Sequence, residues 1–271
     1  MKIETIVFVL LVIILYIIFF VRKNDPSIYE PIYDYNDLRD KFRTGDIIFF
    51  SCQKSDSLYN MIEYYFRTNF VGSQFGHVGL VVRDERNELY VLECTKHHHC
   101  ADRHANWLNE RGLGGIRIIN MDILIRKYHR RNNAIFGVRF ISREIPVTLV
   151  RNVLNRYRDV TFESKSWLYL LGIIDICFSH RIAENLLVLA NKKKMMCSEF
   201  VHHFLHQCGV LGYYPSKLFW PHLFNDNRMM EELEIVKYSK LFKFTLQLTS
   251  ETETCPDSEK NNNKTQKNNQ N

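Results

Sequence analysis

The chain has 271 residues, of which 46% are hydrophobic and 24% charged, and its 36 basic and 30 acidic residues give a formal net charge of +6. This composition excludes a wholly disordered chain and a transporter with many membrane spans, and the length suits one medium-sized domain with attachments. The seven cysteines show no paired spacing. Because a domain of this size needs no covalent staples, we expect free thiols in a reducing compartment.

The first feature along the chain is an uncharged apolar run over 5–21. Its 17 residues are close to the lower limit for a helix that crosses a hydrocarbon core about 30 Å thick. A cleaved signal peptide is the alternative, but no small-x-small cleavage motif follows. Arg22 and Lys23 outweigh Lys2 on the other flank, so the positive-inside rule places the large domain on the cytosolic side. We therefore expect residues 1–23 to form the anchor of a single-pass membrane protein.

Three parts follow the anchor. Residues 24–37 carry two prolines and mixed charge, as a linker does. Residues 250–271 are Asn-rich and lack apolar periodicity, so we expect a disordered tail. Between them, 38–249 contains early strand patterns and later helix patterns, which predicts one α+β domain rather than alternating βαβ units. The expected strands are 47–50, 78–82, 89–94, 116–119 and 134–140, and the expected helices are 146–158 and 197–208.

Cys197 is a candidate nucleophile because it begins a helical apolar stripe. The i, i+3, i+4 pattern runs from Cys197 to Cys208, and Gly209 ends it. A thiol in the first turn of a helix lies at the positive end of the helix dipole, and the lysines at 192–194 add positive charge. Both effects favour the nucleophilic thiolate. A small buried core cysteine is the alternative for Cys197, and it is our interpretation of Cys208.

His77 is the candidate base for this thiol. It lies in a strand pattern between Gly76 and Gly79, where the missing side chains let another element approach the imidazole. A hairpin turn centred on Glu85 would place His77 directly opposite Glu93, with their Cβ atoms roughly 5 Å apart. A buried Glu93 would then orient His77 and stabilise its cation, as the third member of a triad does. A structural histidine and a solvent-facing glutamate are the alternatives.

Five motifs occur in an order that is typical of one protein family. They are Thr44-Gly45-Asp46-Ile47-Ile48-Phe49-Phe50, Gly76-His77-Val78-Gly79, Leu92-Glu93-Cys94-Thr95, Met196-Cys197-Ser198-Glu199-Phe200-Val201 and Trp220-Pro221-His222-Leu223-Phe224. Over about 38–224 the chain resembles the permuted papain-like amidases of the NlpC-like superfamily. These include the bacterial YaeF/YiiX proteins, a set of poxvirus proteins and, more distantly, lecithin retinol acyltransferase. As in the permuted members, the histidine precedes the cysteine.

This resemblance implies a circularly permuted papain-like fold, in which an antiparallel sheet packs against helices behind the transmembrane anchor. It also implies a cysteine hydrolase in which Cys197 is the nucleophile, His77 the general base and acid, and Glu93 the orienting residue. The thiolate would attack an amide or ester carbonyl and give a thioester, which water or a second acceptor resolves. Amidase, peptidase, lipid acyl hydrolase and acyltransferase activities all fit this scheme. The expected partners are a host or virion membrane and a peptide or lipid substrate, with no cofactor, no metal and no nucleic acid.

Two other functional interpretations stay open. The first is a zinc-binding module built from a cluster of cysteines and histidines, although adjacent histidines diverge and no second pair completes a tetrahedral set. The second is a catalytically inactive binding or virion-structural protein that keeps the fold without the chemistry. Nucleic-acid binding is less favoured, because no aromatic residues interleave the basic ones, and a lipid surface accounts for the positive charge. The zinc cluster comprises Cys94, His97, His98, His99, Cys100 and His104.

Overall fold

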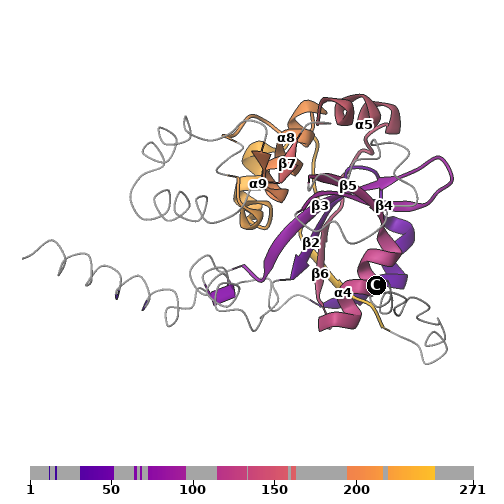
Figure 1. Ribbon diagram of the computed structural model, residues 1–271, viewed down its shortest axis with the longest axis vertical. Helices are drawn as coiled ribbons and strands as arrows, with labels where there is room; N and C mark the ends of the chain where they lie inside the picture. Colours follow the sequence, from indigo (N-terminus) through magenta and orange to yellow (C-terminus); the bar gives the residue numbers. More distant parts are fainter. Residues whose placement is uncertain are drawn as a thin grey trace, which may run out of the picture.

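The computed structural model describes residues 31–51, 73–95, 115–132, 134–157, 160–162, 194–215 and 219–247, together with Val12, Tyr16, Tyr64, Tyr65 and Thr68. Within these residues the chain forms a mixed α+β domain around a seven-stranded sheet of order β1-β9-β6-β2-β3-β4-β5 (Figure 1). The expected α+β class is therefore confirmed. The strands are β1 (Ile32–Asp34), β2 (Ile47–Ser51), β3 (Phe75–Arg83), β4 (Leu89–Cys94), β5 (Ile116–Asn120), β6 (Phe136–Arg139) and β9 (Phe242–Thr245).

Neighbouring strands of this sheet are antiparallel, except that β1 runs parallel to β9. A second, two-stranded sheet pairs β7 (Thr161–Phe162) with β8 (Lys194–Met195). All five expected strands and both expected helices are confirmed, with boundaries that differ by a few residues. The helices are α2 (Tyr35–Leu38), η2 (Arg39–Lys41), α4 (Met121–Asn132), α5 (Val147–Leu154), η4 (Asn155–Tyr157), α8 (Cys197–Gln207), η7 (Pro221–Phe224) and α9 (Asn227–Leu233).

The sheet separates two apolar layers because successive side chains of a strand point to opposite faces. On one face, β3 contributes Val78 and Leu80 to a core shared with Phe200 and Phe204 of α8. On the other face, Val81 lies in a core formed with α2 and α4. Figure 1 accordingly shows α5, α8 and α9 on one side of the sheet and α4 on the other. This arrangement places the start of α8 against the strands that carry His77 and Glu93.

The predicted linker over 24–37 extends too far into the fold. Ile32–Asp34 forms the edge strand β1, and Asp34 then caps α2 by accepting a hydrogen bond from the Asn36 backbone N–H at 3.0 Å. The strand signal was weak because β1 has three residues and two of them, Ile32 and Tyr33, are exposed. The folded domain therefore begins before the expected boundary at residue 38.

The expected anchor over 1–23 lies outside the described residues apart from Val12 and Tyr16, and the expected tail over 250–271 lies wholly outside them. Among the residues that the structure does describe, no helix has the length and apolar character needed to cross a membrane.

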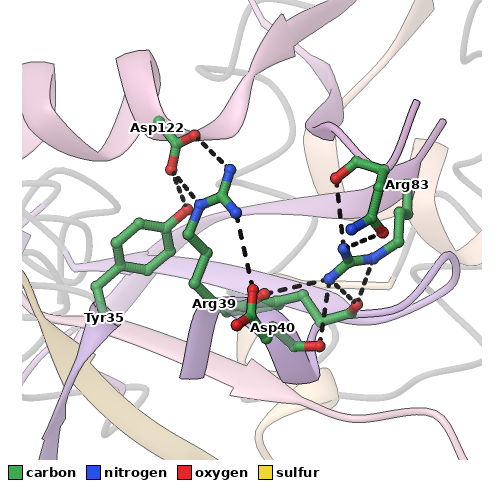
Figure 2. Close-up of polar contacts among 7 residues, drawn as sticks. Tyr35, Arg39, Asp40, Arg83 and Asp122 are labelled. Carbon is green, nitrogen blue, oxygen red and sulfur yellow. Dashed lines mark hydrogen bonds and ion pairs between the residues drawn. The ribbon is translucent and has the colours of Figure 1, made fainter. Parts of the chain in front are cut away.

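Polar contacts fasten the segment after β1 to both α4 and β3 (Figure 2). The hydroxyl of Tyr35 donates to Asp122 Oδ1 at 2.6 Å, and Arg39 donates from Nε and Nη2 to the same carboxylate at 3.1 and 3.0 Å. Arg83 of β3 donates from Nη2 to the Phe42 carbonyl at 2.8 Å. The start of the domain is thus tied to the first turn of α4.

Asp46 fixes the turn that leads into β2. The side chain is fully buried, and its two oxygens accept hydrogen bonds from the backbone N–H groups of Arg43 at 2.6 Å and Ile141 at 2.7 Å. A buried carboxylate needs such donors because desolvation of an unpaired charge is costly. Asp46 therefore joins the turn before β2 to the residues that follow β6.

We expect Asp46→Ala to lower the free energy of unfolding by roughly 2–4 kcal/mol, because it leaves backbone N–H groups without acceptors. Asp84→Ala is the matched control, since Asp84 also accepts two backbone hydrogen bonds, from Arg86 and Glu88, but in an exposed turn. Urea denaturation of the full-length protein in detergent measures both losses. Equal losses for the two variants would contradict the role given to Asp46.

Candidate active site

The hairpin of β3 and β4 brings His77 and Glu93 together. His77 Nε2 lies 2.5 Å from Glu93 Oε2, and the Glu93 side chain is fully buried whereas the His77 side chain is 20% exposed. The ring of Phe50, which pairs with His77 across β2 and β3, packs on the imidazole with a centroid separation of 5.3 Å. The predicted pair is therefore in contact.

The predicted register of this hairpin was wrong by two residues. Leu80 pairs with Leu92 and Val81 with Val91, so paired numbers sum to 172 and the turn is centred on Arg86. The turn has the expected length but lies one residue further along the chain, and within it Asn87 adopts a left-handed conformation with φ of 66°, which asparagine tolerates well.

Since the slip is an even number of residues, the faces of the two strands are unchanged. Glu93 lies opposite Gly79 and reaches His77 along the diagonal of the ladder.

Gly79 makes this diagonal contact possible. A Cβ atom at position 79 would lie 2.6 Å from Val91 Cγ1 and 3.5 Å from Glu93 Cβ. The first distance is too short for real atoms, so any side chain here would push β4 away from β3. The glycine that marked this strand in the sequence therefore leaves room for Val91, and it keeps β4 close enough to β3 for Glu93 to reach His77.

Arg117 of β5 completes the site and was not predicted. It pairs with Glu93 in the ladder of β4 and β5, and it contacts Glu93 Oε1 through Nε at 2.6 Å and Nη2 at 2.5 Å. Each carboxylate oxygen of Glu93 therefore has its own cationic partner. A sequence signal did exist, because Arg117 is the one charged residue of β5, just as Glu93 is the one charged residue of β4.

Cys197 is the first residue of α8, and its side chain is hydrogen-bonded to that of His77. Because Glu93 occupies Nε2 of the imidazole, Nδ1 is the nitrogen left to face the thiol. The helix start is fixed by Glu199, whose Oε2 accepts from the Met196 backbone N–H at 3.2 Å. The structure thus brings all three predicted residues, Cys197, His77 and Glu93, into one chain of contacts.

The ionisable groups of the site shift one another's pKa values toward their charged forms. Burial lowers the pKa of His77, but the Cys197 thiolate and the Glu93 carboxylate raise it more, from 6.5 to about 9. Burial acts to raise the pKa of Glu93, but His77 and Arg117 lower it to about 2. His77 is therefore cationic at neutral pH. Because its folded-state pKa is raised, the stability it contributes is complete below about pH 6.5 and is lost as the pH rises through about 9.

The proposed zinc cluster falls mostly outside the described residues, since 97–100 and His104 lie there. Cys94 is described and fully buried, and its thiol donates to the Met195 carbonyl at 3.3 Å. In the described part of the chain, no group of three histidine, cysteine or acidic side chains is placed to hold a metal. The fifth sequence motif forms η7, which lies against β3.

Comparison with known proteins finds a relative of this chain. No family model matches it. It is 40% identical over 232 residues to an uncharacterized protein, R372, of Acanthamoeba polyphaga mimivirus, an alignment that covers 85% of this chain and 92% of the mimivirus protein. The chain belongs to the same family as this mimivirus protein. The alignment is long enough to include most of the domain described above.

We expect Gly79→Ala to destabilise the protein by roughly 1–3 kcal/mol, as overpacking of a well-packed core does, and to lower the pKa of His77 because Glu93 is displaced. Urea denaturation and an NMR pH titration of His77 measure the two effects in the full-length protein. Gly212→Ala is the control, because an added Cβ there meets no atom closer than 3.3 Å. An unchanged His77 titration in Gly79→Ala would contradict the steric argument.

We expect Arg117→Gln to raise the pKa of His77 further, because it removes a cation from the carboxylate that His77 contacts. It should also cost roughly 3–5 kcal/mol of stability, as loss of one partner from a buried ion pair does. Arg143→Gln, at an exposed position, is the control and should change neither quantity. A lower His77 pKa in Arg117→Gln would show that Arg117 acts differently.

Proposed function

We propose that this protein is a membrane-anchored thiol hydrolase or acyltransferase of the permuted papain-like type. Cys197 is the nucleophile, His77 the general base and acid, and Glu93 the orienting residue. The observation that carries the proposal is the double contact of the His77 imidazole, which is bonded to the Cys197 thiol on one side and to a fully buried Glu93 on the other. Nucleophile, base and orienting acid in this sequence of contacts are the elements of a catalytic triad.

The location of Cys197 supports the same chemistry. As the first residue of α8, an 11-residue helix, it lies where backbone N–H groups have no acceptor within the helix and the helix dipole favours negative charge. These N–H groups can donate to the oxyanion of a tetrahedral intermediate. The cationic His77 stabilises the thiolate from its other side. Cys208 at the far end of α8 has the opposite setting, because burial raises its pKa to about 12.

The reaction proceeds in two halves. The Cys197 thiolate attacks the carbonyl carbon of an amide or ester, and His77 gives its proton to the departing amine or alkoxide, which leaves a thioester. Water or a second acceptor then attacks the thioester while His77 takes up its proton, and the acid or transferred acyl product leaves as the Cys197 thiolate is restored. Anchoring through residues 1–23 would hold this site near lipid or lipid-linked substrates.

We expect iodoacetamide to alkylate Cys197 of the full-length protein at least roughly a hundredfold faster than Cys208, since the thiolate is the reactive form. His77→Ala should slow this labelling roughly tenfold or more, and His129→Ala, which changes a histidine of α4, should not. Mass spectrometry of the labelled peptides gives the rates. Equal labelling of Cys197 and Cys208, or no effect of His77→Ala, would overturn the proposal.

The pH dependence separates catalysis from mere thiol reactivity. Turnover of amide and ester probes should fall as the pH rises through about 9, because His77 then has no proton for the leaving group, while alkylation of Cys197 should not fall. Cys197→Ser should abolish turnover. Reactive Cys197 with no turnover of any acyl probe would favour the alternative of an inactive binding or virion-structural protein.

A further inference from the structure

The outer face of α4 is a solvent-exposed, basic surface on the side of the sheet away from α8. Ile123, Arg126 and Arg130 are exposed, Ile123 by 58%, and Lys127 is half-buried. At 3.6 residues per turn, these four side chains fall within about 100° of the helix circumference. The opposite side of α4 packs into the core through Met121, Leu124 and Ile125. One helix therefore has an inner face that is apolar and an outer face that is basic around a single isoleucine.

Two arginines of this outer face, Arg126 and Arg130, are exposed to solvent. Within the described part of the chain, neither Arg126 nor Arg130 forms an ion pair. The nearest acid on the helix, Asp122, is already engaged by Tyr35 and Arg39 (Figure 2). A surface with several arginines and lysines and without acids attracts an anionic partner.

The path of the chain indicates which anionic partner lies nearby. Ten residues, 22–31, lie between the uncharged run over 5–21 and residue 32, and ten extended residues span at most about 35 Å. The segment that then enters the domain is bonded to Asp122, next to Ile123, through Tyr35 and Arg39. If 5–21 crosses a bilayer, the first turn of α4 is tied to the part of the domain that leaves the membrane.

The side chains of the outer face also suit lipid better than nucleic acid. Proteins that bind single-stranded nucleic acid present aromatic rings for the bases to stack on. On α4 the aromatic residue, Tyr128, turns inward, where its ring lies 4.9 Å from that of Phe50. An exposed isoleucine among basic residues is instead the pattern of a helix that rests in the headgroup region of an anionic membrane.

We propose that the outer face of α4, formed by Ile123, Arg126, Lys127 and Arg130, rests on the anionic lipid surface of the membrane to which the chain is anchored. This contact orients the domain, with the basic side chains at the headgroups and Ile123 inserted between them. The proposal rests on the membrane anchor but not on the chemistry of Cys197, so each can fail without the other.

The test places the photocrosslinker p-benzoylphenylalanine at position 123 of the full-length protein, reconstituted in vesicles of phosphatidylcholine alone or with 30% phosphatidylserine. Lipid adducts at position 123, identified by mass spectrometry, should be several-fold more abundant with phosphatidylserine. Each basic residue near an anionic surface changes binding by a factor of about five, so Arg126→Gln and Arg130→Gln should each lower the adduct yield by up to that factor.

The matched control places the same crosslinker at Ile235, which is 66% exposed and follows α9 on the opposite side of the sheet. It should give little lipid adduct in either vesicle. Equal adducts at 123 and 235, no phosphatidylserine dependence at 123, or no adduct at 123 would each overturn the proposal.

Two further arms complete the test. Failure of 5–21 to insert would overturn the proposal in this form, and mixing the protein with preformed vesicles then shows whether position 123 meets anionic lipid without an anchor. Added duplex or single-stranded RNA tests the competing partner. RNA adducts at 123 that displace the lipid adducts would show a nucleic-acid surface instead. Cysteine labelling of the same samples reports on Cys197 independently.

Discussion

The site depends on the burial of one carboxylate. Glu93 has no exposure to solvent, and an ionised carboxylate can remain there only if cations and hydrogen bonds replace water. The sheet supplies them from both sides of β4, with His77 on β3 and Arg117 on β5. The three strands must therefore keep one register, because each partner reaches Glu93 only from its own ladder position. On the β3 side, Gly79 lets the two strands lie close together by leaving the space that Val91 of β4 fills.

Much of the local structure could be predicted from the sequence because it depends on local rules. Apolar runs bounded by turn residues predicted β2 to β6, and the i, i+3, i+4 stripe predicted α8 with Cys197 at its start. The prediction that His77 and Glu93 lie on the same face of the sheet was correct despite a two-residue error in register, because side chains along a strand alternate between faces with a period of two. The exact pairing depended on where the turn falls, and no apolar pattern specifies the observed turn, in which Asn87 has a positive φ.

Long-range features could not be obtained in this way. The strand β1 pairs in parallel with β9 at the other end of the domain, and its three residues carry almost no periodic signal. Arg117 is separated from Glu93 by 24 positions, so their contact follows from the order of the strands rather than from spacing. The α4 helix was missed because four of its residues are arginine or lysine within a short segment, so its apolar inner face is narrow.

Arg117 also explains how a triad built on a buried glutamate can pass through its catalytic cycle. In the proposed reaction His77 gives its proton to the leaving group, and at that moment Glu93 loses the positive charge of one of its two partners. A site with His77 alone would then hold an uncompensated buried carboxylate, and its cost would add to the barrier. Arg117 keeps its charge throughout because a guanidinium does not deprotonate in proteins. Arg117 weakens the electrostatic attraction between Glu93 and the His77 cation. It therefore lowers the free-energy cost of releasing the His77 proton. Glu93 therefore orients His77 without trapping it in the charged form.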